Sequence, residues 1–315
     1  MSNRQSPNFI FILGPTASGK TELAFELCQK LSAPMINMDS IQMYKHLEIG
    51  SAKPSDEELS GINHFLFSEY DYPDTATASD VFDKVIKYIS AHSYENYILC
   101  GGSGFYIKAL CEGMFEIDDV DPQIRQSLEK QISENGSEDL YNEWLSIDPE
   151  SAKKTSSNDH YRIVRALEIY RQFGKTISEL QKTVGTQKPG LGKLGNVIKL
   201  GRNYSKEELN KRIEKRTQKM LSEGLVEEVE GIVSRGMLDW APMASVGYKE
   251  TVEFLSSKEN TSTEELFEKI VIKTRQLAKK QRTWLNREDE IHWLDGDLDL
   301  HQSSQSAINI LNQQG

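Results

Sequence analysis

Few of the features that mark secreted, membrane-spanning or metal-binding proteins occur in this sequence. It holds only three cysteines, Cys28, Cys100 and Cys111, and no Cys-x-x-Cys pair, so we expect reduced thiols rather than disulfides. Its longest early apolar run covers residues 9–13, which is too short for a secretory signal or for a bilayer span of about 20 residues. The six histidines lack paired ligand spacing, which argues against a zinc site. We therefore expect a cytoplasmic protein with no membrane partner.

Positive charge is scarce overall but unevenly distributed. The composition, with 37% apolar and 27% charged residues, is that of an ordinary globular protein, and the net charge is −11. Residues 153–216 nevertheless hold 16 basic and 6 acidic side chains, and residues 269–287 hold seven basic and no acidic ones. Such blocks can form a polyanion-binding face or simply the solvated side of helices. Composition leaves both interpretations open.

Short apolar runs alternate with helical patterns in the first third of the chain. Residues 8–13, 35–38 and 97–100 read as buried strands, and residues 20–31 and 78–89 read as helices. Strands that alternate with helices predict an α/β fold with a parallel sheet and helices on both faces, and ligand chemistry at the carboxyl ends of the strands.

The pattern changes between residues 118 and 195. Helical patterns at 123–132, 138–145 and 159–173 follow one another without a strand, and a glycine-rich stretch at 185–195 closes the region. The α/β pattern then resumes with a strand at 196–200 and helices at 206–221, 226–234 and 263–285, whereas the tail beyond Gly296 shows no clear pattern. We therefore expect a core formed by residues 1–117 and 196–315, with residues 118–195 as a mainly helical insertion domain.

The first strand and helix are joined by a phosphate-binding loop. The segment Gly14-Pro15-Thr16-Ala17-Ser18-Gly19-Lys20-Thr21 matches G-x-x-x-x-G-K-[ST] at every position. Its backbone N–H groups can converge on a phosphate at a helix N-terminus. Lys20 would neutralise phosphate oxygens, and the Thr21 hydroxyl would ligate Mg²⁺. We expect a nucleotide or another ligand with at least two phosphates, in a P-loop NTPase-like core.

Polar residues follow two further predicted strands. Asp39 comes after the second strand and could bind Mg²⁺ or act as a base, although it could equally be a turn carboxylate. Ser103 lies in the glycine-rich turn at 101–106, after the third strand. Because the strands end at one edge of the sheet, we expect both side chains to face the same crevice.

Several motifs in this order resemble those of the tRNA dimethylallyltransferase (tRNA isopentenyltransferase) family, bacterial type. The matching segments run from residue 14 to residue 284 and are GPTASGKTELA, DSIQMYKHLEIGSAKP, GGSGFYIKAL, ND at 158–159 with YRIVRALE, RIxxRxxxML at 212–221, VGYKE and TRQLAKKQRTW. The first is generic to P-loop proteins, whereas the second and the last are specific. The resemblance implies transfer of a dimethylallyl group from dimethylallyl diphosphate to N6 of adenosine 37 in tRNA.

The resemblance also implies roles for individual residues. Asp39 would be the general base, Ser103 would contact the target adenine, and the P-loop with Lys20, Thr21 and Mg²⁺ would bind the diphosphate that leaves. The implied tRNA contacts are Asp39, Ser40, Ile41, Gln42, Ser103, Arg125, Tyr161, Arg162, Ile163, Val164, Arg165, Ala244, Ser245, Val246, Gly247, Tyr248, Lys249, Arg275, Gln276, Lys279, Lys280, Gln281 and Arg282. Three positions depart from the family: Ser103 replaces the usual Thr, Tyr161 a common Gln, and Ala244 a common Arg.

Three other functions compete with this one. A P-loop kinase of a nucleotide or small metabolite would use the same first loop, but it would not explain the basic segment 269–287. An adenylate isopentenyltransferase would use the same chemistry on a free nucleotide. A non-enzymatic, RNA-binding P-loop switch would not need Asp39 and Ser103 in one crevice. Because the sequence shows no coiled-coil heptad, we expect a monomer.

Overall fold

The computed structural model describes residues 6–257 and 262–314, and the chain divides into two compact units. Unit 1 comprises Met1–Cys111 and Leu194–Gly315, and unit 2 comprises Glu112–Lys193. These boundaries lie a few residues before those expected from the sequence. None of the helices within the described ranges has both the length and the apolar content needed to cross a bilayer.

Unit 1 is built on a six-stranded sheet in which every pairing is parallel. The strand order is β3-β2-β4-β1-β7-β8. The strands are β1 (Asn8–Leu13), β2 (Met35–Asn37), β3 (His64–Phe65), β4 (Asn96–Gly101), β7 (Asn196–Asn203) and β8 (Ile291–Asp295). This sheet confirms the predicted α/β class. It also brings the carboxyl ends of β1, β2, β4 and β7 to one edge, where ligand sites of such folds form.

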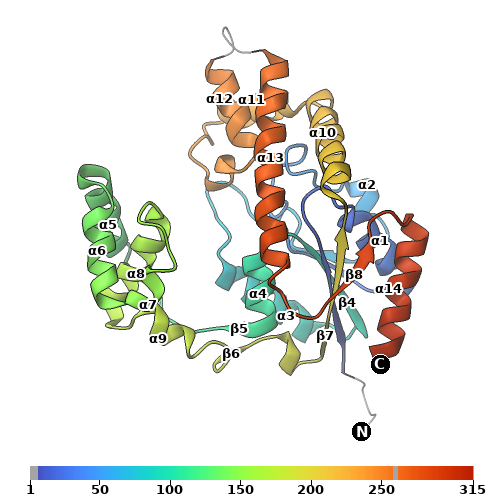
Figure 1. The fold of residues 1–315 in the computed structure, drawn as a ribbon, viewed down its shortest axis with the longest axis horizontal. Coiled ribbons are helices and arrows are strands. Elements are labelled where there is room, and N and C mark those ends of the chain that lie inside the picture. Colours follow the sequence, from blue (N-terminus) through green and yellow to red (C-terminus); the bar gives the residue numbers. More distant parts are fainter. Residues whose placement is uncertain (1–5, 258–261, 315) are drawn as a thin grey trace. The chain divides into compact units, whose positions relative to one another are not determined.

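Helices of unit 1 lie on both sides of these strands, with α1 and α14 on one side and α4 on the other (Figure 1). Its helices are α1 (Lys20–Leu31), α2 (Asp56–Leu59), α3 (Ala78–Ala91), α4 (Gly104–Glu112), α10 (Lys206–Ser222), α11 (Leu225–Ser234), α12 (Tyr248–Ser256), α13 (Thr263–Leu285) and α14 (Leu300–Gln314). Inward side chains of β1, such as Ile10 and Ile12, pack with Leu23 and Leu27 of α1 in a continuous core. The longest helix, α13, starts at a capping box formed by Ser262 and Glu265.

The tail beyond Gly296, which showed no clear pattern, is an ordered helix. Helix α14 packs against α1, where Ala307 joins the core and Lys30 Nζ donates to Ser304 Oγ at 2.8 Å. The residues of α14 that are buried, Ser303, Ser304 and Ala307, are all small. Leu300, Ile308 and Leu311 also pack against this core, but the polar run at 301–306 interrupts the apolar periodicity that predicts a helix.

Unit 2 is mainly helical. Its helices are α5 (Pro122–Asn135), α6 (Glu138–Ile147), α7 (Pro149–Ala152), α8 (His160–Phe173) and α9 (Ile177–Gln181), and a short antiparallel pair is formed by β5 (Gly113–Met114) and β6 (Lys188–Pro189). The core contains Leu128, Leu140, Trp144, Ile163 and Leu167. The three helices predicted here are therefore present, and their observed ends differ from the predicted ones by only a few residues.

Candidate active site

The P-loop joins β1 to α1, as its motif requires. The Lys20 side chain is buried, and its Nζ lies 3.5 Å from the Pro15 carbonyl oxygen. Burial lowers the pKa of Lys20 from its ordinary value, and the nearby Asp39 carboxylate opposes that shift. The first N–H groups of α1 have no partner inside the helix. A desolvated ammonium beside free helix N–H groups makes a strong anion site.

The ends of β2 and β4 bring Asp39 and Ser103 together, as expected. The two strand ends approach so closely that a Cβ on Gly101 would lie 2.2 Å from the Met38 carbonyl carbon, so only glycine fits. Ser103 Oγ accepts a hydrogen bond from the Ser40 N–H at 3.0 Å. Asp39 Oδ1 accepts one from the Ile41 N–H at 2.9 Å, which orients its carboxylate.

A narrow cleft joins these elements. Its lining includes Lys20, Thr21, Asp39, Gln42, Gly101 and Arg216. The Thr21 hydroxyl and the Asp39 carboxylate are oxygen donors of the kind that Mg²⁺ prefers. No group of three or more His, Cys, Asp or Glu suited to a metal occurs among the described residues. The cleft therefore fits Mg²⁺ that takes most of its ligands from water and a bound diphosphate, rather than a metal held by the protein alone.

Three arginines converge on the P-loop, and the sequence analysis gave none of them a role. Arg202 Nη1 donates to the Gly19 carbonyl at 3.1 Å, and Arg212 Nε donates to the Ala17 carbonyl at 2.8 Å. Arg216 Nη1 donates to Thr16 Oγ1 at 3.0 Å. The i, i+4 spacing of Arg212 and Arg216, which puts them on one face of α10, was the available signal. The spacing does not show that the two guanidinium groups contact the P-loop.

Gln281 lies inside the candidate active site. Its Oε1 accepts from the Thr16 N–H at 2.8 Å, and its Nε2 donates to the Gly102 carbonyl at 3.3 Å. The family resemblance implied only a tRNA contact here. Gln281 thus connects the P-loop and the second glycine-rich turn to α13.

The basic helix α13 carries three of its other predicted tRNA-binding residues along a groove, whereas Arg282 is half-buried and does not line it. Gln276, Lys279 and Lys280 are exposed and line it, together with Thr283, Trp284 and Arg287. Arg275 instead pairs with Glu214 of α10. Helix α13 thus buries Leu266, Ile270 and Leu285 and presents Lys279 and Lys280 to solvent.

The segment at 244–249 presents only some of its side chains. Ala244 and Lys249 are exposed, whereas Tyr248 is fully buried and its hydroxyl donates to Glu228. The side chain of Tyr248 is therefore not available to RNA in this conformation. Burial and the neighbouring Glu228 raise the pKa of Tyr248, so its hydroxyl keeps its proton.

In unit 2, several predicted tRNA-binding residues gather on α5 and α8. The Arg125 guanidinium lies over the Tyr161 ring, 5.6 Å from its centroid, and Tyr161 is exposed. Arg165 donates to the buried Glu168 carboxylate at 2.7 Å, and Arg125 lies 3.7 Å from the same carboxylate. Arg162 is exposed, whereas the Ile163 and Val164 side chains are buried in the core of this unit. The side chains of Ile163 and Val164 therefore stabilise the fold of this unit and are not available to contact RNA.

Comparison with known proteins shows consistent similarities. The family described as IPP transferase matches residues 42–288. The tRNA dimethylallyltransferase of Bdellovibrio bacteriovorus is 39% identical over 291 residues, covering 91% of this chain and 92% of that protein. The tRNA dimethylallyltransferase of Geobacter metallireducens is 35% identical over 298 residues, covering 94% of each chain.

Solved structures give the same result. The chain resembles the tRNA delta(2)-isopentenylpyrophosphate transferase of Staphylococcus epidermidis, with 31% identity, a TM-score of 0.67, and coverage of 98% of this chain and 100% of that one. It also resembles a eukaryotic dimethylallyltransferase described as acting on tRNA, with 26% identity, a TM-score of 0.77, and coverage of 98% and 79%.

Proposed function

The chain belongs to the IPP transferase family, and from this premise we propose that it transfers a dimethylallyl group from dimethylallyl diphosphate to N6 of adenosine 37 in tRNA, with release of pyrophosphate. One observation carries the proposal. Lys20 and Thr21 of the P-loop line one cleft with Asp39, and Ser103 Oγ accepts from the N–H of Ser40, the residue after Asp39. Gln281 of the basic helix α13 accepts from the N–H of Thr16 in the same P-loop. A kinase would need the P-loop but would have no use for a basic helix bonded to it.

Bond exchange at the allylic carbon is the chemical step. The bond from that carbon to the diphosphate oxygen breaks, and a bond to the adenine N6 forms. Lys20, Arg216 and the N–H groups at the start of α1 stabilise the charge that develops on the leaving diphosphate. Mg²⁺, bound by Thr21 and the diphosphate, would neutralise part of the same charge.

The adenine amine is a weak nucleophile because its lone pair is delocalised into the ring. Asp39 accepts the N6 proton as the new bond forms, and the Ile41 N–H holds its carboxylate in place. Ser103, whose Oγ accepts from the Ser40 N–H, retains its own hydroxyl proton as a donor to the target base. Both residues thus act on the base from neighbouring strand ends.

The substrate base reacts only after it leaves its stack in the anticodon loop. The cations along the groove of α13, Lys279, Lys280 and Arg287, are suited to the phosphates on either side of an extruded base. The half-buried Arg125 and the exposed Tyr161 and Arg162 of the insertion are further proposed contacts. The buried thiols Cys28 and Cys100 support a reducing, cytoplasmic location, and we propose that the protein acts there as a monomer.

Incubation with radiolabelled dimethylallyl diphosphate tests this function. The label should move to unmodified tRNA, and not to AMP or ATP, with one pyrophosphate released per group transferred. Replacement of adenosine 37 by guanosine should abolish the transfer. Labelling of AMP in preference to tRNA would instead identify an adenylate isopentenyltransferase. ATP consumption without prenyl transfer would identify a kinase.

A further inference from the structure

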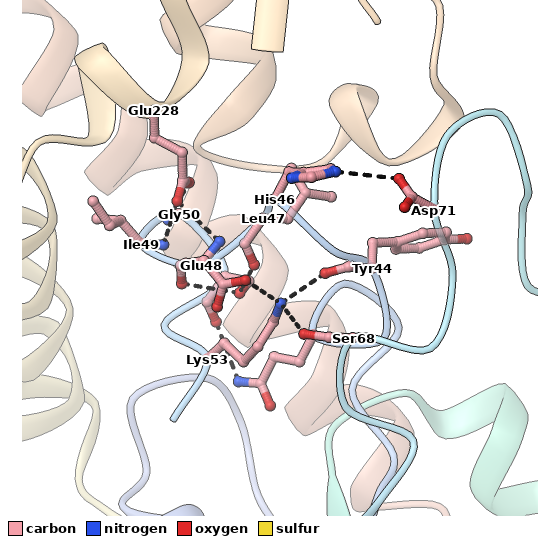
Figure 2. A network of polar contacts seen from close by, with 12 residues as sticks. Tyr44, His46, Leu47, Glu48, Ile49, Gly50, Lys53, Ser68, Asp71 and Glu228 are labelled. Atoms are coloured by element: carbon pink, nitrogen blue, oxygen red, sulfur yellow. Dashed lines mark hydrogen bonds and ion pairs between the residues drawn. The ribbon is translucent and has the colours of Figure 1, made fainter. Parts of the chain in front are cut away.

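A carboxylate on α11 holds a loop that borders the candidate active site (Figure 2). The Glu228 side chain accepts hydrogen bonds from the three consecutive backbone N–H groups of residues 48–50, at 2.9, 2.7 and 3.1 Å. It also accepts one from the Tyr248 hydroxyl at 2.7 Å. Residues 47–52 belong to no helix or strand, so contacts of this kind determine where the loop lies.

The loop fits closely against the elements that carry this carboxylate. A Cβ on Gly50 would lie 2.6 Å from the Tyr248 ring and 2.9 Å from Leu225 Cδ1, so the backbone approaches as closely as glycine allows. Three consecutive N–H groups, from Glu48 to Gly50, are thus held by one carboxylate, which the Tyr248 hydroxyl also contacts.

The same loop contacts the candidate active site through a carbonyl. The Ser51 carbonyl oxygen accepts from Arg216 Nη2 and from Gln42 Nε2, both at 3.3 Å. Arg216 also donates to Thr16 Oγ1 of the P-loop at 3.0 Å. Hydrogen bonds at either end of the backbone segment 48–51 therefore link Glu228 to a guanidinium that lines the cleft.

The remaining support for the loop is local. Lys53 Nζ, whose side chain is 3% exposed, donates to the Tyr44 carbonyl at 2.7 Å, to Ser68 Oγ at 2.8 Å and to Glu48 Oε1 at 2.9 Å. These partners lie 5 to 15 residues from Lys53 along the chain. Glu228, by contrast, lies 178 to 180 residues from the backbone N–H groups that it accepts from, and it links the loop to α11.

We propose that Glu228 is a positioning residue for diphosphate binding: by holding the backbone of residues 48–50 it fixes the Ser51 carbonyl, which in turn orients the Arg216 guanidinium toward the diphosphate. Glu228 lines no part of the cleft and touches no substrate. Its place in the first turn of α11 favours its negative charge, because the helix N-terminus carries partial positive charge. The role in diphosphate binding rests on the proposed function.

Glu228→Gln is the direct test, with Glu227→Gln as its matched control. Both variants remove one negative charge from the first turn of α11, but Glu227 is exposed and lies in no contact with the loop backbone that the structure records. In Glu228→Gln the amide presents N–H donors toward backbone N–H donors, so the loop shifts. We expect KM for dimethylallyl diphosphate to rise by about 10- to 100-fold, the scale of a misplacement of about 1 Å, with KM for tRNA unchanged.

A double-mutant cycle with Arg216→Gln separates positioning from general destabilisation. If Glu228 acts through Arg216, the Glu228→Gln change should have little further effect on KM once Arg216 has been replaced. Tyr248→Phe, which keeps the ring and removes only the hydroxyl, should give a smaller rise and supplies the test if Glu228→Gln does not fold.

Binding of inorganic pyrophosphate with Mg²⁺, measured by calorimetry, keeps this inference separate from the proposed function. Wild-type protein that binds pyrophosphate but prenylates no tRNA would refute the function, while the variants could still be compared for binding. An equal KM or affinity in Glu228→Gln and Glu227→Gln would overturn the positioning role. The positioning role would also be overturned if the increases in KM caused by Glu228→Gln and by Arg216→Gln multiply in the double variant.

Discussion

The side-chain oxygen of Gln281 accepts a hydrogen bond from the backbone N–H of Thr16 at 2.8 Å, although 265 residues separate the two in the chain. The helix that carries the exposed basic groove is thereby joined to the loop that binds phosphate. A residue in this place can affect both substrates, because its neighbours on α13 face outward while its own amide faces the P-loop.

Gln281→Glu should weaken diphosphate binding. The carboxylate still accepts from the Thr16 N–H, but it faces the Gly102 carbonyl without a donor and adds negative charge beside the P-loop. A loss of about 1.5–3 kcal/mol, or roughly 10- to 100-fold in affinity for dimethylallyl diphosphate, is expected in equilibrium binding without tRNA. Gln276→Glu, the same change at an exposed position of α13, should leave that affinity unchanged. Equal affinities in the two variants would contradict the placement.

Asp39→Asn should lower kcat by about 10² to 10⁴, the usual effect of losing a general base. The amide keeps the shape of the side chain and can still accept from the Ile41 N–H, so the loop stays in place. Affinity for pyrophosphate measured without Mg²⁺ should not fall, because a carboxylate does not attract phosphate. Single-turnover prenylation of tRNA measures the chemical step directly. Near-normal turnover would leave Asp39 as a turn residue only.

Diphosphate binding should weaken with rising pH through Lys20. Burial lowers the pKa of this ammonium, which must be charged to attract the ligand. Affinity is therefore complete below that pKa and is lost as the pH rises through it, earlier than for a lysine with its ordinary pKa of about 10.4. Pyrophosphate affinity of wild type and Lys20→Arg should be compared across pH, since the ligand's own titration affects both equally. Parallel curves would show that Lys20 does not titrate in this range.

The exposed lysines of α13 should determine how tRNA binding depends on salt. Replacing Lys279 and Lys280 by Ala should reduce the log–log slope of affinity against salt by about one to two, because each phosphate contact releases slightly less than one counterion. Lys87→Ala, an exposed change on α3, should leave the slope as in wild type. Pyrophosphate affinity should be unaffected in both variants. Coincident slopes for wild type and the double variant would exclude this groove as the RNA surface.

Thr21→Ala should raise the Mg²⁺ concentration needed for half-maximal activity. The Thr21 hydroxyl is an uncharged oxygen donor that lines the cleft, and without it a water molecule must take its place as a ligand of Mg²⁺. Excess EDTA should abolish wild-type transfer, and added Mg²⁺ should restore it. Full activity in EDTA, or an unchanged Mg²⁺ requirement in Thr21→Ala, would remove the metal role assigned to this residue.

Elements with a local signal could be predicted closely. Strand β1, helix α1 and helix α13 have the predicted bounds, because apolar periodicity and the P-loop motif lie within a few consecutive residues. Asp39 and Ser103 could be placed together for a similar reason, since parallel strands end at one edge of their sheet. Helix α14 could not, because the polar run at 301–306 separates Leu300 from the apolar residues that pack beside it and so interrupts the pattern.

The sequence by itself determined the P-loop and the family, because both are encoded in short segments whose spacing is diagnostic. Only the tertiary structure decided which distant residues complete the site. Arg202, Arg216 and Gln281 meet the P-loop from elements that follow it by about 200 residues or more. Glu228 likewise reaches its loop across the fold. These contacts depend on how the whole core packs and on which charged groups it buries, so no pattern within a short segment predicts them.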